Sequence, residues 1–290
     1  MIILAATPLG DPADASAKLV RLLGSADIVA AEDTRRVRRL ASDLGVQITG
    51  RLMSFYDAVE ASKAGDLVAA AADGATVLVV SDAGTPVISD PGYRLVAAAV
   101  AAGVPVRVAP GPSAVTAALA VSGLPSDRFT FEGFLPRRPG ELARELSALT
   151  EERRTMVFFE SPRRLPASLA AMVLAFGEQR QVAVCRELTK TYEEVVRGPL
   201  VQVAAQLGDQ VRGEITIVVA GDRDAGSSRT DSELASAVAT EMAAGSSRRD
   251  SAALVAERWG VPRRRVYQAS LAADPRSERT AATDVEPPRP

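Results

Sequence analysis

Short runs of apolar, often β-branched residues recur along the first 110 residues and alternate with alanine-rich stretches of helical character. Strands that are covered on both faces read as continuous apolar runs, because neither face meets water. This alternation therefore predicts an N-terminal α/β domain over residues 1–120, built on a buried parallel sheet with helices on its faces. The runs are IILAA (2–6), DIVAA (27–31), TVLVV (76–80) and VPVRV (104–108).

The same alternation resumes after a stretch marked by Pro and Gly between residues 123 and 139. It predicts a second α/β domain over residues 121–222. Its expected strands are TMVFF (155–159), QVAVC (181–185), YEEVV (192–196) and EITIVV (214–219).

The remaining chain is different in character. Charge, Gly and Ser without periodicity predict a flexible linker over residues 223–232, and the Pro-rich residues 275–290 are expected to be disordered. Between them, residues 233–274 predict a small helical unit.

Two short helices are expected within this unit, at residues 246–260 and 261–271, separated by Gly260 and Pro262. They are similar to a helix-turn-helix, with a small core expected from Leu254, Val255 and Trp259. RNA docking and a role in packing or dimer formation are both open for it.

The amino-acid composition limits the classes of protein to which the chain can belong. Of the 290 residues, 47% are hydrophobic and 24% charged, which is typical of a folded globular protein. No apolar run could span a membrane, and MIILAATPLG lacks the features of a signal peptide, so a cytoplasmic location is expected. The single cysteine, Cys185, reads as a core residue, and the absence of histidine argues against a zinc site. A net charge of -2 means that any affinity for RNA must be local.

Three loops follow predicted strands, where backbone amides and helix starts can face a ligand. They are ATPLGD (6–11), the rigid and acidic VSDAGTPVISDPG (80–92) and APGPSAV (109–115). Each could also be an ordinary turn, since α/β proteins use Gly and Pro there. None is a P-loop or a GxGxxG motif, which disfavours nucleoside triphosphate and dinucleotide chemistry.

These loops belong to a longer succession of motifs that runs from about Ile3 to Gly221. The chain resembles the ribosomal RNA small subunit methyltransferase I family in eight motifs. They are ATPLGD, AAEDTRR (30–36), VSDAGTPVISDPGYRLV (80–96), APGPSAVTAAL (109–119), SGLPSDRFTFEGFLPR (122–137), FFESPRRL (158–165), RELTKTYEEVVRG (186–198) and GEITIVVAG (213–221).

The resemblance implies two α/β domains of the tetrapyrrole-methylase type, with S-adenosyl-L-methionine bound in the cleft between them. It implies methylation of a ribose 2′-oxygen of a cytidine in the decoding centre of 16S rRNA. The implied partners are 16S rRNA or the small ribosomal subunit, and a second copy of the chain in a homodimer.

The family motifs also imply a set of cofactor contacts, largely through the backbone. The chain departs from the family's pattern at Asp11, where Asn is usual, and at FYDAVEASK (55–63), where members often carry a histidine-rich segment. Tyr56 is a candidate to fill that space. The implied cofactor-binding residues are Pro8, Asp82, Gly84, Thr85, Pro86, Ile88, Ser113, Ala114, Phe159 and Ile215.

A ribose hydroxyl needs help in losing its proton, and without histidine the candidates are carboxylates or a lysine of lowered pKa. Lys190 is one of three lysines, and neighbouring positive charge at Arg186 would favour its neutral form. Lys190 either accepts the proton or binds phosphate. Asp33 and Glu160 are rival bases, and each could instead be a salt-bridge partner.

RNA phosphates would require a local positive surface. Arginines cluster after several predicted strands. The first cluster, over residues 35–39, follows Asp33, and a helix that begins there would direct these arginines toward the substrate. Ordinary solvated surface charge is the alternative for each pair. The candidate RNA-binding residues are Arg35, Arg36, Arg38, Arg39, Arg137, Arg138, Arg163, Arg164 and Arg186.

Two other functions remain open. A tetrapyrrole or diphthine-type methylase would share the cofactor loops but not the arginine clusters. A ribosome-assembly factor that binds RNA without catalysis would not bind S-adenosylmethionine.

Overall fold

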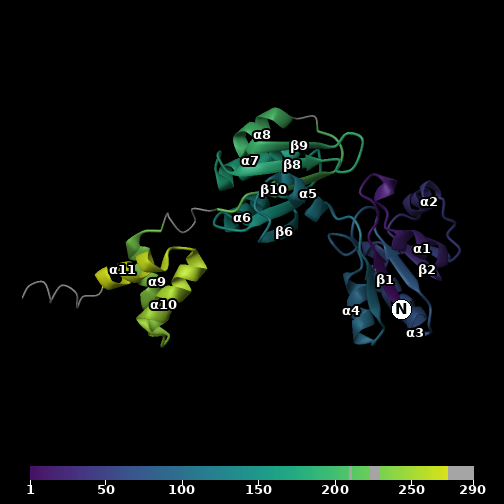
Figure 1. The fold of residues 1–290 in the computed structure, drawn as a ribbon, viewed down its shortest axis with the longest axis horizontal. Coiled ribbons are helices and arrows are strands. Elements are labelled where there is room, and N and C mark those ends of the chain that lie inside the picture. The colour runs from purple at the N-terminus through teal and green to yellow at the C-terminus, as the bar shows by residue number, and fades with distance from the viewer. Residues whose placement is uncertain (209–210, 223–228, 274–290) are drawn as a thin grey trace, which may run out of the picture. The chain divides into compact units, whose positions relative to one another are not determined.

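The computed structural model describes residues 1–208, 211–222 and 229–273 (Figure 1). The tail predicted over residues 275–290, residue 274 of the predicted helical unit and residues 223–228 of the predicted linker lie outside the described residues. The chain forms two compact units, one of residues 1–149 and 154–220, the other of residues 150–153 and the residues from 221 on.

The first sheet of the large unit is parallel throughout, in the order β3-β2-β4-β1-β5. Its strands are β1 (Ile2–Ala5), β2 (Ile28–Ala31), β3 (Arg51–Ser54), β4 (Val77–Val80) and β5 (Val106–Ala109). The four predicted strands are therefore confirmed. The edge strand β3 is an addition, because the sequence RLMS is short, partly polar and only half-buried.

Helices cover both faces of this sheet. They are η1 (Pro12–Asp14), α1 (Ala17–Ser25), α2 (Thr34–Asp43), α3 (Asp57–Ala72) and α4 (Tyr93–Ala101). Leu19 and Leu23 of α1 and Val37 of α2 pack in one apolar cluster, whereas Leu67 of α3 and Leu95 of α4 pack in the other. Each central strand is thus buried on both sides, as its continuous apolar run predicted.

The second sheet has the order β6-β7-β10-β8-β9 and mixed directions. Only β6 and β7 run parallel, and the other neighbours are antiparallel. The strands are β6 (Phe129–Phe134), β7 (Thr155–Glu160), β8 (Gln181–Arg186), β9 (Glu194–Pro199) and β10 (Ile215–Val219). Strand β6 was hidden in the segment that the sequence marked as rich in Pro and Gly.

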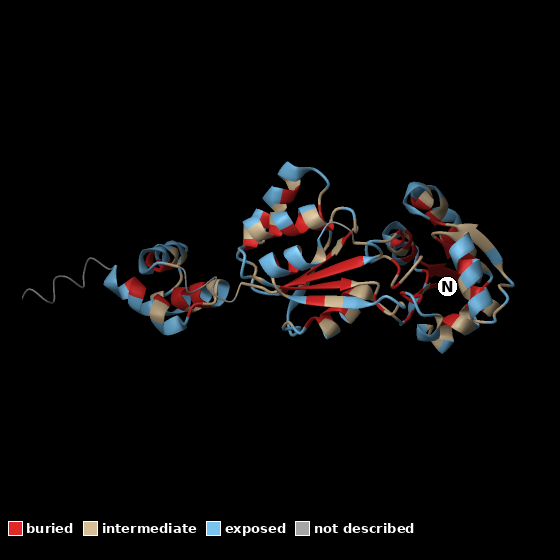
Figure 2. Cartoon of the chain, turned by 90° about the horizontal axis from the view of Figure 1, so that it is seen from above, coloured by how far each residue is buried: buried red, intermediate tan, exposed pale blue. Residues whose placement is uncertain are grey.

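Four helices flank the second sheet. They are α5 (Ala114–Ser122), α6 (Pro139–Ala148), α7 (Leu165–Phe176) and α8 (Leu200–Leu207). Helices α6, α7 and α8 share one core with the sheet, and α5 packs on its other face against Cys185 and Val218. The predicted domain boundary after residue 120 is therefore too late, because α5 belongs to the second sheet. Figure 2 shows the buried strands between these layers.

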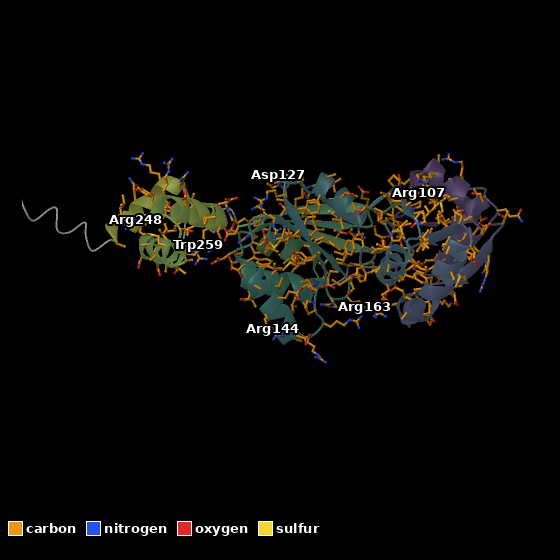
Figure 3. The ribbon with its side chains drawn as sticks, turned by 90° about the horizontal axis from the view of Figure 1, so that it is seen from below. Arg107, Asp127, Arg144, Arg163, Arg248 and Trp259 are labelled. Atoms are coloured by element: carbon orange, nitrogen blue, oxygen red, sulfur yellow. The ribbon has the colours of Figure 1, made fainter. Side chains whose placement is uncertain are left out.

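The small unit contains the helices α9 (Asp231–Ala243), α10 (Arg248–Trp259) and α11 (Arg263–Ala272), drawn with side chains in Figure 3. Helix α9 starts one residue after Thr230, which forms a capping box with Glu233, so the predicted linker ends earlier than residue 232. Val255 is buried and Trp259 packs against the core, as predicted, but Leu254 is 45% exposed and contributes little.

Candidate functional site

The three loops singled out in the sequence leave adjacent strands at the same level. Ala5 at the end of β1 pairs with Val80 at the end of β4 and with Ala109 at the end of β5. Parallel strands bring their carboxyl ends to one edge of the sheet, where ligands of open α/β sheets bind. The three loops are therefore neighbours.

Hydrogen bonds connect these loops to one another. Thr7 N donates to Gly84 O at 2.9 Å, and Gly84 N donates to Thr7 O at 3.0 Å. Thr85 Oγ1 donates to Pro112 O at 3.1 Å, which ties the second loop to the third. The loops thus form a single scaffold whose free edge can face a ligand.

The second loop has an unusual backbone. Gly84 has φ of +75°, and a Cβ there would lie 3.2 Å from the Leu9 side chain. Val87 and Ser89 also have positive φ, at 77° and 63°, which is costly for residues with a side chain and is common at functional loops. Surrounding contacts must hold this conformation.

Buried Glu60 provides one of these contacts. Its Oε1 accepts hydrogen bonds from the backbone amides of Gly92, Arg94 and Leu95, at 3.0, 2.8 and 3.2 Å. These amides begin α4, where helix geometry leaves them without partners and where the helix dipole favours a negative charge. A residue of α3 therefore fixes the end of the ligand-facing loop.

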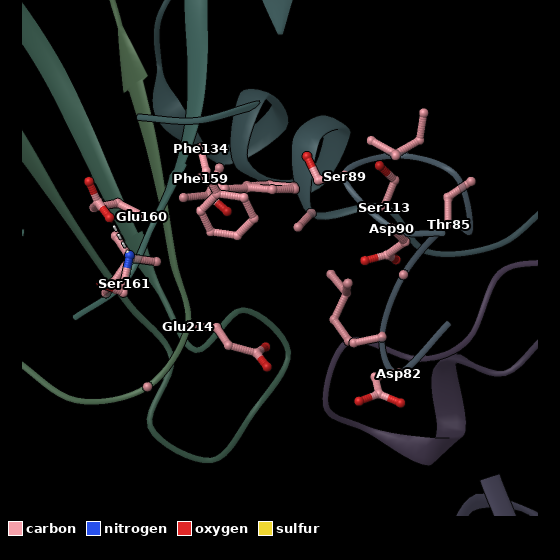
Figure 4. A pocket seen from close by; sticks show the side chains of 18 of the residues that line it. Asp82, Thr85, Ser89, Asp90, Ser113, Phe134, Phe159, Glu160, Ser161 and Glu214 are labelled. Atoms are coloured by element: carbon pink, nitrogen blue, oxygen red, sulfur yellow. Dashed lines mark hydrogen bonds between the residues drawn. The ribbon is translucent and has the colours of Figure 1, made fainter. Parts of the chain in front are cut away.

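A central cavity of about 390 Å³ opens between this scaffold and the second sheet (Figure 4). Phe159 packs edge-on against Phe134, with ring centroids 5.5 Å apart, and forms an apolar wall. Opposite lie the acidic loop and the start of α5, whose first residue follows Ser113 without a side-chain cap. A cavity of this size can hold a small molecule, since small-molecule sites span about 300–1,000 Å³.

Most of the predicted cofactor residues meet at this cavity. Pro8 lies instead in the adjacent cavity described below, and buried Pro86 lines neither. The eight that line the central cavity are Asp82, Gly84, Thr85, Ile88, Ser113, Ala114, Phe159 and Ile215.

Sequence reasoning did not assign several other lining residues, among them Leu9, Glu32, Asp90, Phe134 and Glu214. Asp90 was visible as an acid in a rigid loop, and Glu214 directly precedes the predicted contact Ile215. Leu9, Glu32 and Phe134 come from separate segments, so only the folded chain shows that they share the cavity.

Carboxylates give the cavity a negative side. Burial, together with the charges of Glu32 and Asp82, raises the pKa of Asp90 to about 7, against a hydrogen bond from Ser81 that lowers it. Burial and the charge of Asp82 also raise the pKa of Glu32. A cation bound beside these carboxyl groups would stabilise their charged form and lower their raised pKa values. The cavity therefore favours a positively charged ligand.

A second cavity of about 300 Å³ adjoins the first and shares five lining residues with it, namely Leu9, Arg36, Asp82, Ala83 and Glu214. We call it the adjacent cavity. Lys190 lies here, and its Nζ donates to Glu187 Oε1 and Glu214 Oε2, both at 2.9 Å. The other residues that line the adjacent cavity include Pro8, Gly10 and Arg39.

The expected lowering of the Lys190 pKa is wrong. Burial lowers it, but the hydrogen bonds and charges of Glu187 and Glu214 outweigh burial, so the pKa is raised. Arg186, which was to supply the opposing charge, instead pairs with Glu194 at 3.0 Å. Lys190 is therefore a charged ammonium, suited to a phosphate rather than to accepting a proton.

The stem of Lys190 crosses the first loop. A Cβ on Gly10 would lie 2.1 Å from Lys190 Cγ, which is closer than atoms can approach. Beside it, Asp11 N donates to Thr189 Oγ1 at 3.3 Å. The loop around Lys190 thus contacts the loop after β1, and Gly10 is the residue that leaves room for it.

The two rival bases have structural partners. Asp33 caps α2 and accepts two hydrogen bonds from the Arg35 side chain, at 3.1 and 2.7 Å, which lower its pKa. Glu160 lines the central cavity, but its carboxylate accepts from Ser161 N, from Ser168 Oγ and from Arg164 at 2.7, 2.6 and 3.4 Å. Both carboxylates therefore have structural partners in this arrangement.

The predicted arginine cluster of α2 divides between two sides of the helix. Arg36 lines both cavities and pairs with Asp82 at 3.3 Å, and Arg39, one turn further, lines the adjacent cavity. Arg38 lines a different pocket, and Arg35 is held by Asp33. A helical cluster cannot face one ligand as a whole, because its residues span more than half of the helix circumference.

The other predicted arginines differ in their roles. The guanidinium of Arg164 donates to the carbonyls of Leu135 and Pro136, so this side chain holds the segment after β6 in place. Arg138 pairs with Glu141 at 3.0 Å on the surface. Arg137 and Arg163 are exposed.

The described residues contain no group of three or more acidic or cysteine side chains placed to hold a metal ion. Cys185 is buried, and burial raises its pKa to about 12, as expected of a core residue. Nor does any described helix have the length and apolar character to cross a membrane.

Comparisons with known proteins agree with this site. The family model for Tetrapyrrole (Corrin/Porphyrin) Methylases matches residues 1–204. A crystal structure of uroporphyrin-III-C-methyltransferase from Thermus thermophilus matches with a TM-score of 0.55 at 22% identity, over 76% of this chain and 93% of that chain. This likeness concerns the fold.

Closer relatives carry one shared name, "Ribosomal RNA small subunit methyltransferase I". The protein of Mycobacterium tuberculosis (strain CDC 1551 / Oshkosh) is 54% identical over 93% of this chain and 94% of its own length. That of Escherichia coli O157:H7 is 38% identical over 91% of this chain and 92% of its own length. This chain thus belongs to the tetrapyrrole methylase family and, within it, to the ribosomal RNA small subunit methyltransferase I group.

Proposed function

We propose that this protein transfers a methyl group from S-adenosyl-L-methionine to the ribose 2′-oxygen of a cytidine in the decoding centre of 16S rRNA. The observation that carries the proposal is the 54% identity, along 93% of the chain, to a relative named for ribosomal RNA small subunit methylation. The cavities described above supply the physical support.

The residues of the central cavity fit the cofactor. S-adenosylmethionine supplies a methyl group on a positively charged sulfur, together with an ammonium group and an adenosine. The cationic groups suit the side formed by Glu32, Asp82 and Asp90, and the adenosine suits the apolar side formed by Phe134 and Phe159. The open backbone around Gly84 and Ser113 leaves room for hydrogen bonds to its polar edge.

The adjacent cavity fits the substrate. Three cations line its walls, namely Arg36, Arg39 and Lys190, and each is paired with a carboxylate that a phosphate would displace. The cavity shares Leu9 and Asp82 with the central cavity. Guanidinium and ammonium groups are the usual protein contacts of RNA phosphates. A nucleotide whose phosphate is held here would have its ribose near the cofactor.

We infer that Asp90 is the general base, which accepts the proton of the attacking ribose hydroxyl. Asp90 lines the central cavity, and its pKa is raised to about 7 in the cofactor-free protein, so it can be ionised and accept a proton near neutral pH. General bases work best when their pKa lies near the working pH. Lys190 is then a phosphate contact, and Asp33 and Glu160 hold the structure around the site.

Transfer of a radioactive methyl group tests the function. We expect label from S-adenosylmethionine in 16S rRNA after incubation with small ribosomal subunits or naked rRNA, and its position on a ribose oxygen is read by nuclease mapping. Label on a base, or only on a tetrapyrrole or a protein, would contradict the proposal.

Cofactor titration separates catalysis from mere RNA binding. Calorimetry should detect S-adenosylmethionine binding to the purified chain. RNA binding without cofactor binding would favour a non-catalytic assembly factor. The implied homodimer stays a prediction that sedimentation of the full chain checks.

A further inference from the structure

The small helical unit carries positive charge where it opposes helix stability. Arg248 and Arg249 open α10, and Arg263, Arg264 and Arg265 open α11. The start of a helix is the positive end of its dipole, so cations there are unfavourable. Sites where a sequence breaks a local rule are often functional.

Part of this charge has a structural explanation. Arg265 Nε donates to Asp231 Oδ1 at 3.1 Å and so connects α11 to the start of α9. By contrast, Arg249, Arg263 and Arg264 are exposed, and no ion pair joins them to an acidic residue in the part of the chain that the structure describes. Their charge needs another explanation.

Among the acidic residues of this unit that the structure describes, none is ion-paired with these three arginines, and most are engaged elsewhere. Glu257, near the end of α10, has no ion pair within the described residues. The engaged pairs are Asp231 with Arg265, Glu233 with Arg229, Glu241 with Arg258, and Asp250 with Ser247.

The three arginines also lie near groups that contact nucleic acids. Arg263 Nη2 donates to Arg249 O at 3.3 Å, so the starts of α10 and α11 are adjacent. Tyr267 is 39% exposed and Gln268 is exposed, each four residues after Arg263 or Arg264 and therefore on the same side of α11. We call these five residues the basic face.

We propose that the basic face binds the backbone of ribosomal RNA. The inference rests on the proposed function, and it assigns the small unit a role that the cavities of the large unit do not supply. Unpaired arginines match a polyanion, and Tyr267 and Gln268 offer stacking and hydrogen bonding to exposed bases. An acidic protein surface would explain the charge but would leave the tyrosine unused.

The test compares two full-length triple variants, R249Q/R263Q/R264Q and the control R21Q/R51Q/R144Q. The control removes the same charge from exposed arginines of the large unit that are outside both cavities. Affinity for naked 16S rRNA and for small subunits is measured across a range of salt concentrations. Cofactor affinity, melting temperature and methyl transfer are measured alongside.

We expect the Kd of the basic-face variant for RNA to rise at least about tenfold at low salt, and the slope of log K against log salt to fall by about 2. The KM for RNA should rise, with kcat at saturating RNA and cofactor affinity retained. The melting temperature should hold or increase, because charges that oppose the helix dipoles are removed. A purely structural role predicts a lower melting temperature instead.

Two outcomes would overturn the inference in distinguishable ways. If the wild type binds and methylates rRNA and the basic-face variant matches it, the basic face is not an RNA contact. If the wild type itself neither binds nor methylates rRNA, the proposed function fails and this inference with it.

Discussion

Asp90 faces the central cavity with a pKa of about 7, so its charge depends on pH under physiological conditions. A bound sulfonium cation favours the ionised form and lowers the pKa. We therefore expect cofactor binding to release a proton near pH 7. Affinity for S-adenosylmethionine should rise about tenfold from pH 6 to pH 8 and then level off.

Calorimetry in two buffers of different ionisation enthalpy measures this proton release. Asp90→Asn should abolish the release and flatten the pH profile, whereas Asp127→Asn, at an exposed position, should behave as the wild type. Equal proton release by D90N and the wild type would show that another group titrates.

Ionised Asp90 favours cofactor binding, but it lowers the stability of the cofactor-free protein. Its pKa is raised from 3.8 to about 7 in the folded chain, so folding is penalised as pH rises through this window. We expect Asp90→Asn to stabilise the cofactor-free protein at pH 8 by about 1 kcal/mol after solvent screening, and to change little at pH 4. Urea unfolding at the two pH values checks the difference.

The position of the Lys190 side chain depends on the absence of a side chain at Gly10. A Cβ at position 10 cannot coexist with the observed path of Lys190. Gly10→Ala and Lys190→Ala should therefore both raise the KM for RNA by about tenfold, with cofactor affinity retained, because each removes a phosphate contact worth about 1 kcal/mol or more.

Gly65→Ala is the matched control, since a Cβ there meets nothing within 4 Å inside α3. It should keep activity and stabilise the helix by up to about 1 kcal/mol. Full activity in G10A would mean that Lys190 is free to move without cost.

At the scale of elements, the start of α4 depends on a residue from α3. Glu60 is 5% exposed and satisfies three amides of that start. Glu60→Ala leaves these donors without a partner, so we expect a loss of about 2–3 kcal/mol in the free energy of unfolding. Weaker cofactor binding should follow, because α4 anchors the loop that ends at Gly92.

Chemical denaturation measures this loss, with Glu178→Ala as the control at an exposed position. Glu60→Gln should be intermediate, since an amide oxygen still accepts but carries no charge for the helix dipole. Stability of E60A equal to that of the control would exclude the capping role.

The elements also show what the sequence could predict. Buried strands such as β4 read as unbroken apolar runs, and eight were located within a few residues. Strands β3 and β6 were missed, because an edge strand has one solvated side and β6 contains a bulge between Phe131 and Gly133. Strand direction in the second sheet was not predictable, since an apolar run is the same in either direction.

The site was predictable to a similar extent. Loops after β1, β4 and β5 carry turn residues with a recognisable order, so their convergence was foreseen. The charge state of Lys190 was not, because it depends on Glu214, which is 24 residues away and reaches it only through the pairing of β10 with β8. Electrostatics of this kind arise from tertiary contacts.

At the scale of the whole molecule, the two compact units have separate cores, and the central cavity lies in the large unit. The chain has a single tryptophan, Trp259, which packs in the small unit beneath the Arg229 guanidinium, 4.8 Å from its ring centroid. Tryptophan fluorescence therefore reports the unfolding of the small unit alone, whereas far-UV circular dichroism is dominated by the large unit.

A ligand stabilises only the unit that binds it, by about 2.7 kcal/mol at a hundredfold excess over its Kd. We expect saturating S-adenosylmethionine to raise the midpoint seen by circular dichroism by several degrees and to leave the fluorescence midpoint unchanged. Asp90→Asn should reduce the first shift without affecting the second. If both midpoints rose together, the small unit would unfold with the large one, and the basic face would be energetically coupled to the central cavity.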